Sequence, residues 1–176
     1  MKNKFMQTIV GTFLALLMLF GCTQIFVSGQ ESEQGALQEE QAERSRDRLV
    51  GAWRTAVTQL NCQTGLPLAP ASRGLLTFNE GGTMSEYNSP GQNPATRSPG
   101  HGVWVRESGF FDYYFTFVIN RYNASGAFVG AQKITAYLKF GANGSDFTTN
   151  AAIEIFDAND NLTGRGCATS IGTRIE

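Results

Sequence analysis

The first candidates for chemically active side chains are three cysteines, Cys22, Cys62 and Cys167, and a single histidine, His101. Zinc sites use short Cys and His spacings, whereas Cys62 and Cys167 are separated by most of the chain, so no metal-ligand set is expected. Met1–Gly21 has the positive start and uncharged apolar run of an export signal. An even pair of cysteines in an exported protein is most simply a disulfide, which predicts a Cys62–Cys167 bond.

Acidic side chains are the next candidates for chemistry. Glu86 and Glu154 could face each other inside a barrel as an acid/base pair. However, Glu154 alternates with two isoleucines and so points outward, and we expect Glu86 to be exposed as well. Asp157–Asn161 begins like a calcium loop but lacks the glycine and the distal glutamate, so it is interpreted as a turn. No nucleophile motif surrounds His101. We therefore predict that the protein is not an enzyme and uses no cofactor or metal.

The N-terminal segment also indicates a role for Cys22. After a positively charged start, Phe5–Phe20 is apolar and uncharged, and it ends in Leu19-Phe20-Gly21-Cys22. This ending resembles the lipobox of bacterial lipoprotein signals, in which the cysteine is lipidated and becomes the N-terminus. The resemblance implies a signal peptide over 1–21, a fatty-acid (palmitate) anchor on Cys22 and a place in the bacterial cell envelope. Because Thr23 and not Asp follows the cysteine, the resemblance implies the outer membrane in a bacterium that has two membranes. An uncleaved anchor and ordinary secretion are the alternatives.

The remainder of the chain divides into a tether and one domain. Residues 22–48 are predicted to be a flexible polar tether, because this segment is rich in Glu, Gln, Arg and Ser and cannot bury a helical stripe. Residues 49–176 have a normal size for one domain. Basic and acidic residues are equally frequent in that domain, and the whole chain has a formal net charge of −1. Phosphate binding requires clustered positive charge, so nucleic acid is not expected as a partner.

The composition of the domain is typical of strands and turns, since Gly, Phe, Tyr, Val and Ile dominate it. Short hairpin turns join the last four predicted strands, which favours an all-β, eight-stranded antiparallel up-and-down barrel. Two long Pro-rich loops leave a β-sandwich as the alternative. The predicted strands are Gly51–Leu60, Gly74–Asn79, Thr83–Asn88, Gly102–Glu107, Phe110–Arg121, Gln132–Phe140, Asp146–Phe156 and Gly164–Ile175.

One strand has a dense aromatic row. Phe111, Tyr113, Phe115 and Phe117 alternate along the predicted strand Phe110–Arg121, so they share one face. The interior of an eight-stranded barrel is just wide enough to be filled by side chains or to hold one small ligand. The row could therefore line a cavity for an apolar compound or fill the core, and both interpretations stay open.

The two ends of the domain suggest how the barrel closes. Gly51-Ala52-Trp53 resembles the Gly-x-Trp signature of lipocalins, whose last strand supplies an arginine that packs over the tryptophan. Arg174 is the matching position in this chain. A closed barrel pairs its first and last strands antiparallel. If Cys62 lies opposite Cys167, Arg174 falls one diagonal step from Trp53 and on the same face. The resemblance implies a lipocalin-like, calycin-type barrel over the whole domain.

These observations favour a protein that acts by binding. The first hypothesis is a lipid-anchored envelope protein, attached to the membrane through Cys22, whose barrel binds a small apolar ligand. The alternative is a protein-binding module with a filled core, such as an envelope inhibitor that inserts a loop into its target. An isomerase or cyclase would need a polar constellation inside the barrel, and the sequence shows none.

Overall fold

The computed structural model of the protein describes residues 47–89 and 94–176. The predicted signal peptide, Cys22 and nearly all of the predicted tether lie outside the described residues. Asp47–Glu176 forms one compact unit. In the described part of the chain, no helix is long and apolar enough to cross a membrane.

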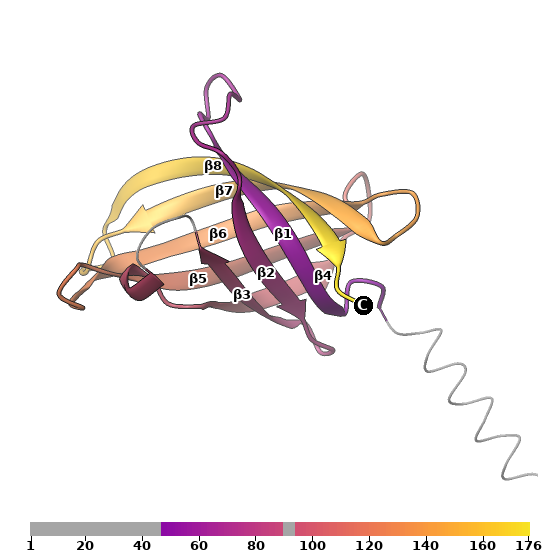
Figure 1. Ribbon diagram of the computed structural model, residues 1–176, viewed down its shortest axis with the longest axis horizontal. Helices are drawn as coiled ribbons and strands as arrows, with labels where there is room; N and C mark the ends of the chain where they lie inside the picture. The colour runs from indigo at the N-terminus through magenta and orange to yellow at the C-terminus, as the bar shows by residue number, and fades with distance from the viewer. Residues whose placement is uncertain (1–46, 90–93) are drawn as a thin grey trace, which may run out of the picture. The chain divides into compact units, whose positions relative to one another are not determined.

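The described residues form a closed antiparallel barrel of eight strands with a single 3-10 turn, η1 (Pro94–Thr96) (Figure 1). Each strand pairs with the next in sequence, and the last pairs with the first, so the sheet has no free edge. This confirms the predicted up-and-down barrel and excludes the sandwich. The strands are β1 (Gly51–Leu60), β2 (Ser72–Phe78), β3 (Thr83–Ser89), β4 (Gly100–Arg106), β5 (Tyr113–Tyr122), β6 (Phe128–Phe140), β7 (Asp146–Phe156) and β8 (Leu162–Arg174).

The start of β5 differs from the prediction, because Phe110 and Phe111 precede the strand. The Asp112 backbone nitrogen donates to the carbonyl of Leu138, and the Asp112 carboxylate accepts from the backbone nitrogen of Phe140 at 2.7 Å. These bonds fix the turn that leads into Tyr113. The ring of Phe111 instead packs on the ring of Tyr137, at 5.3 Å between centroids. Phe111 therefore does not continue the inward-facing row.

The first and last strands close the barrel in a register two residues from the expected one. Trp53 lies directly opposite Arg174, and Leu60 lies opposite Cys167. Cys62 follows the end of β1 and still reaches Cys167, with 5.3 Å between the two Cα atoms. The disulfide is thus confirmed, but it forms diagonally beyond the strand pairing, while the Trp53–Arg174 pair is direct.

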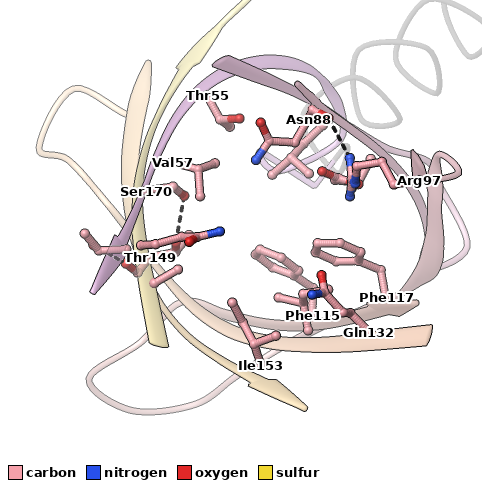
Figure 2. Close-up of a pocket in the computed structure, with 16 residues that line it drawn as sticks. Thr55, Val57, Asn88, Arg97, Phe115, Phe117, Gln132, Thr149, Ile153 and Ser170 are labelled. Atoms are coloured by element: carbon pink, nitrogen blue, oxygen red, sulfur yellow. Dashed lines mark hydrogen bonds and ion pairs between the residues drawn. The ribbon is translucent and has the colours of Figure 1, made fainter. Parts of the chain in front are cut away.

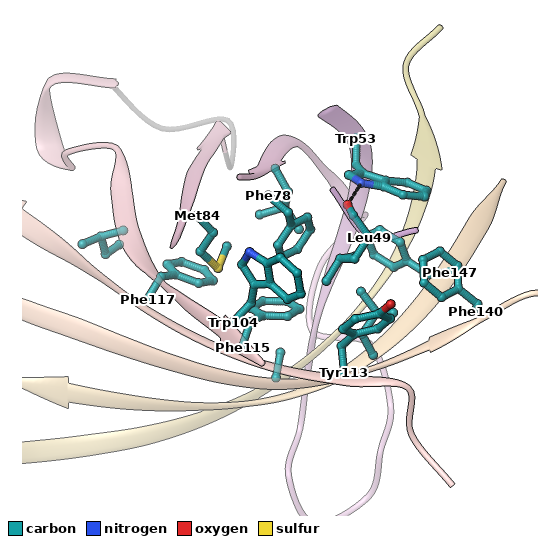
Figure 3. Close-up of a cluster of buried hydrophobic side chains, with 14 residues drawn as sticks. Leu49, Trp53, Phe78, Met84, Trp104, Tyr113, Phe115, Phe117, Phe140 and Phe147 are labelled. Atoms are coloured by element: carbon teal, nitrogen blue, oxygen red, sulfur yellow. Dashed lines mark hydrogen bonds between the residues drawn. The ribbon is translucent and has the colours of Figure 1, made fainter. Parts of the chain in front are cut away.

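Large side chains fill one end of the barrel, here named the closed end. Figure 3 shows a continuous row of buried aromatic rings there, including Trp53, Phe140, Phe147 and Tyr113. The chain enters the domain at this end, where the Trp53 indole nitrogen donates to the carbonyl of Leu49 at 2.9 Å. Leu49 itself is fully buried. The segment before β1 therefore acts as a plug.

A glycine makes room for this filling. A Cβ atom on Gly172 of β8 would lie 2.1 Å from the ring of Phe147, which is closer than any atom can approach. The missing side chain on β8 leaves room for the tip of the Phe147 ring, which packs on Trp53 with 4.9 Å between ring centroids. Close packing at the closed end thus depends on a small residue opposite a large one.

Candidate functional site

The opposite end of the barrel, here named the open end, contains a pocket with a volume of about 120 Å³. Figure 2 shows its walls, to which all eight strands except β4 contribute. At the closed end aromatic rings fill the barrel interior, and a smaller hollow of about 90 Å³ lies beside the turn between β4 and β5, lined by Arg48, Arg106, Glu107, Gly109, Phe111, Asp112 and Tyr113. The pocket residues are Thr55, Val57, Gln59, Leu76, Glu86, Asn88, Arg97, Phe115, Phe117, Gln132, Ile134, Thr149, Ile153, Ala168, Thr169 and Ser170.

One side of the pocket is apolar. Phe115 and Phe117 of β5 stack with 6.2 Å between ring centroids and 17° between their planes. Ile134 and Ile153 lie directly opposite each other on β6 and β7 and continue this surface. Figure 2 shows Phe115, Phe117 and Ile153 on the same side of the cavity. An apolar compound could bury its surface here.

A second side of the pocket carries an ion pair. Glu86 on β3 accepts a hydrogen bond from the Arg97 guanidinium at 2.9 Å, and Arg97 also donates to the carbonyl of Asn88 at 2.7 Å. The Glu86 side chain is 7 % exposed and that of Arg97 is 15 % exposed. Burial raises the pKa of the Glu86 carboxyl, and the Arg97 guanidinium and the Gly100 backbone nitrogen oppose this rise. The pair fixes the segment after η1 against the barrel wall.

Two further polar features belong to the pocket lining. The Asn88 side chain lines the cavity, but its oxygen Oδ1 has less than 1 Å² of accessible surface and no hydrogen-bond partner among the described residues. On the far wall, the hydroxyls of Thr149 and Ser170 share a buried hydrogen bond of 2.7 Å. Figure 2 shows Asn88 and Arg97 across the cavity from Thr149 and Ser170. The pocket therefore has an apolar side between two walls that can form hydrogen bonds.

The structure separates the four aromatic residues that the sequence placed in one row. Phe115 and Phe117 line the pocket. Tyr113 belongs to the closed end, where its hydroxyl donates to the Asp47 carboxylate. Phe111 lies outside the row, against Tyr137. Only two of the four side chains are therefore in a position to contact a ligand in the pocket.

The other predicted site residues lie at the two ends of the barrel. At the closed end, the Arg174 guanidinium lies 4.2 Å from the Trp53 ring centroid. The Cys62–Cys167 disulfide lies at the open end and joins the segment after β1 to the middle of β8. Cys22 lies outside the described residues. Neither the Trp53–Arg174 pair nor the disulfide lines the pocket.

The prediction that Glu86 is exposed was wrong. Met84, Glu86 and Asn88 alternate with exposed or half-buried residues along β3, so they share the inward face with the core. That alternation was visible in the sequence, but the charge of Glu86 argued for the surface. Arg97 was missed because it follows an irregular Pro-rich segment whose path the sequence does not specify. Glu154 points outward as predicted, 3.8 Å from Lys133, so the two glutamates do not form a pair.

No metal centre is found in the part of the chain that the structure describes, since no three His, Cys, Asp or Glu side chains cluster there. His101 is exposed on the outer side of β4. Among the described residues that line the pocket, the Thr149 and Ser170 hydroxyls bond to each other and Glu86 bonds to Arg97. The lining offers apolar contacts and hydrogen bonds.

The fold and the pocket define the class of this protein as a closed eight-stranded antiparallel barrel that is filled at one end and hollow at the other. Comparison of the chain with protein-family models, curated proteins and solved structures finds no match in any of the three.

Proposed function

We propose that this chain is a lipid-anchored bacterial envelope protein whose lipocalin-like barrel binds a small, mainly apolar ligand in the pocket at the open end. One observation carries the proposal: the open end of the barrel contains a cavity of about 120 Å³ whose lining combines stacked aromatic rings with polar side chains. Protein interiors normally fill such space. A hollow with stacked rings on one side and buried polar groups on the others therefore supports a binding role.

The size of the cavity limits the ligand. Pockets for drug-sized compounds measure about 300–1,000 Å³, so this cavity encloses only a small compound, or one end of a longer one that extends through the mouth. A ligand of this size would contact Phe115, Phe117 and Ile153 together.

Filling the cavity tests the ligand proposal. Ala168 on β8 lines the pocket, whereas Ala152 on the neighbouring strand β7 is exposed. Ala168→Phe should abolish the chemical-shift changes that toluene or benzamide causes in the NMR spectrum of the protein, and Ala152→Phe should preserve them. The absence of such changes in the wild type would refute ligand binding at this site.

The anchor is supported by the resemblance of Leu19-Phe20-Gly21-Cys22 to a lipobox, and its test is independent of the pocket. Cells that express the wild type or Cys22→Ala are labelled with a fatty-acid analogue. Label should appear on the wild type alone, and the wild-type protein should be found in the membrane fraction. Equal labelling of both proteins would remove the anchor from the proposal.

A second candidate function, binding to another protein, is favoured by the loop 61–71 between β1 and β2. Figure 1 shows this loop extending beyond the rim of the barrel. Leu66 and Leu68 are 65 % and 64 % exposed on the side of the loop that returns towards β2, so two neighbouring apolar side chains are available to a partner. The disulfide and a hydrogen bond from the Asn61 backbone nitrogen to the carbonyl of Leu66 hold the loop in one shape.

The two functions can be separated by variants. Replacing both Leu66 and Leu68 with Ser should abolish the capture of a partner from an envelope extract if the loop binds a protein, and it should leave toluene binding in the pocket unchanged. Ala168→Phe should have the opposite effects.

A further inference from the structure

The outer wall of the barrel carries a continuous row of apolar side chains next to the closed end. Phe110, in the turn between β4 and β5, is 73 % exposed and packs on Phe111 with 5.1 Å between ring centroids. Phe111 packs on Tyr137, and Tyr137 packs on Tyr114 at 5.4 Å. Val105 lies opposite Tyr114 and is 50 % exposed. These five side chains, here named the aromatic patch, form a contiguous surface of the kind that marks interaction sites.

The turn presents Phe110 in a fixed position. The Lys139 ammonium lies 4.1 Å from the centroid of the Phe110 ring and donates to the Phe110 carbonyl. The Glu107 backbone nitrogen donates to the carbonyl of Asp112 at 3.0 Å and closes the turn. A ring that is already held in place loses little conformational entropy when it binds, so Phe110 suits a contact surface.

The composition of the aromatic patch fits the surface of a lipid bilayer. Phe and Tyr rings are favourable where acyl chains meet headgroups, because their bodies are apolar and the tyrosine hydroxyl can bond to water. A lysine such as Lys139 can bury its stem against the patch and keep its ammonium among the headgroups. Residues 105–112 and 137–140 contain two basic and two acidic side chains. Burial of apolar surface, and not attraction to anionic lipid, would therefore drive the contact.

The chain reaches the domain beside this patch. Asp47, at the start of the domain, accepts a hydrogen bond from the hydroxyl of Tyr113, the residue that follows the turn. Arg48 and Phe111 line the same small hollow of about 90 Å³. Cys22, the proposed site of the lipid, precedes Asp47 by 25 positions, and a segment of that length spans at most about 90 Å. A lipid on Cys22 would thus hold the closed end near the bilayer, where even a weak contact forms because it is intramolecular.

We propose that the aromatic patch docks on the surface of the bilayer that holds the lipid of Cys22, with the Phe110 ring at the boundary between headgroups and acyl chains. This inference rests on the proposed lipid anchor and specifies how the anchored barrel meets the membrane. Because the pocket lies at the opposite end of the barrel, docking directs its mouth away from the bilayer, towards dissolved ligands.

Fluorescence quenching by brominated lipid tests the docking. The acylated protein is purified from the membrane fraction and reconstituted into phosphatidylcholine vesicles that are brominated in the upper part of the acyl chains. The two native tryptophans, Trp53 and Trp104, are buried in the barrel, so the wild type gives a low background. Phe110→Trp places a tryptophan on the aromatic patch. Phe128→Trp is the matched control, at an exposed position where β6 begins at the open end.

The two probes should differ clearly. An interfacial side chain penetrates about 5–10 Å into the boundary between headgroups and acyl chains, so the quenching constant of Phe110→Trp should exceed that of Phe128→Trp by at least about threefold. Adding anionic lipid to the vesicles should leave this ratio unchanged, because the charges beside the patch balance.

A second pair of variants tests whether Phe110 itself drives the docking. Val105→Trp places the probe on the patch and leaves Phe110 in place. Combining it with Phe110→Asp should lower its quenching by at least about twofold, because the charge replaces apolar surface that the bilayer would bury. Combining it with Phe128→Asp should leave the quenching unchanged. Equal losses in the two double variants would overturn the role of Phe110, provided that circular dichroism shows the barrel in both.

The outcomes separate the docking from the anchor, and acrylamide, a quencher dissolved in the water, completes the test. If acrylamide but not the brominated lipid quenches Phe110→Trp, the patch lies in water, and if neither quenches it, protein covers the patch. Either result, or equal quenching of Phe110→Trp and Phe128→Trp by the lipid, overturns the docking while the anchor stands. If the wild type carries no lipid, both the anchor and the docking are overturned.

Discussion

Trp53 and Arg174 lie directly opposite each other on the first and last strands, and the Arg174 guanidinium lies 4.2 Å from the centroid of the Trp53 ring. Arg174 also donates from Nη1 to the carbonyl of Val50 at 3.0 Å and from Nη2 to the carbonyl of Arg48. One side chain thus joins β8, β1 and the segment that plugs the closed end. The closure of the barrel and the sealing of its end depend on the same pair.

Arg174→Lys should destabilise the barrel by about 1–2 kcal/mol. A lysine keeps the charge, but it loses the stacking of the planar guanidinium on the Trp53 ring. It also cannot donate to the carbonyls of Val50 and Arg48 from two separate nitrogens. Urea unfolding followed by Trp fluorescence measures the change. Arg165 is exposed on the same strand, and Arg165→Lys should change the unfolding free energy by less than about 0.5 kcal/mol. Equal effects of the two substitutions would contradict the bridging role of Arg174.

Much of this fold could be predicted because strands and turns alternate clearly in the sequence. The bounds of β1 and β7 agree with the prediction at both ends, because residues typical of turns follow both strands. β5 begins later than predicted because Gly109, with a φ of 147°, and the Asp112 bonds form a turn. A run such as Phe110-Phe111 is indistinguishable from a strand by pattern alone.

The candidate site was less accessible to prediction. The inward position of Glu86 follows from the alternation along β3, but a charged side chain inside a barrel requires a partner, and Arg97 comes from a segment without periodicity. The hollow itself depends on which interior side chains meet across the barrel. Gly172 under Phe147 allows filling at one end, and sequence spacing does not reveal such pairs between distant strands.

The Tyr113 hydroxyl should make stability fall at alkaline pH. Burial, and then the hydrogen bond to Asp47 and the charge of Asp47, raise the pKa of Tyr113 above its usual value of 10.0. A group with a raised folded pKa contributes stability that is complete below the unfolded pKa and is lost as pH rises above it. Unfolding free energies from about pH 9 to pH 11 should therefore decrease, and Tyr113→Phe should reduce the slope. Tyr114→Phe, at a half-buried outward position, is the control and should leave it unchanged.

Removing Arg97 should have an effect that depends on pH. At pH 7, Arg97→Gln leaves the Glu86 carboxylate buried without its cation and should destabilise the barrel by about 3 kcal/mol. The loss of the guanidinium also removes the main influence that lowers the pKa of Glu86. Glu86 then protonates more readily in the folded state, so the stability of the variant should recover as pH falls towards about 4.5.

A control uses an exposed ion pair on the outer face of the barrel. Lys133 and Glu154 are separated by 3.8 Å and are 47 % and 36 % exposed, so Lys133→Gln should cost less than about 1 kcal/mol at any pH. If Arg97→Gln were equally mild at pH 7, the Glu86–Arg97 pair would not be an energetically important part of the pocket wall.

The Cys62–Cys167 bond should contribute stability without determining the topology. It closes a loop over a sequence separation of 105 residues, and in the chain-entropy model such a crosslink contributes up to about 4–5 kcal/mol. Backbone pairing already holds β1 to β8 without the disulfide, along the register from Trp53–Arg174 to Leu60–Cys167. The double variant in which both cysteines become serine should therefore unfold at a lower temperature but keep the circular-dichroism spectrum of the barrel.

Peptide mapping without reductant checks the bond directly, because the two cysteine peptides should elute as one linked species from protein folded under oxidising conditions. The double variant also tests the loop 61–71, which the bond holds at its base. Limited proteolysis should cut the loop near Leu66 faster in the variant than in the wild type, while the strands resist in both. A variant that loses the barrel spectrum altogether would show that the strand pairing between β1 and β8 depends on the disulfide, contrary to this prediction.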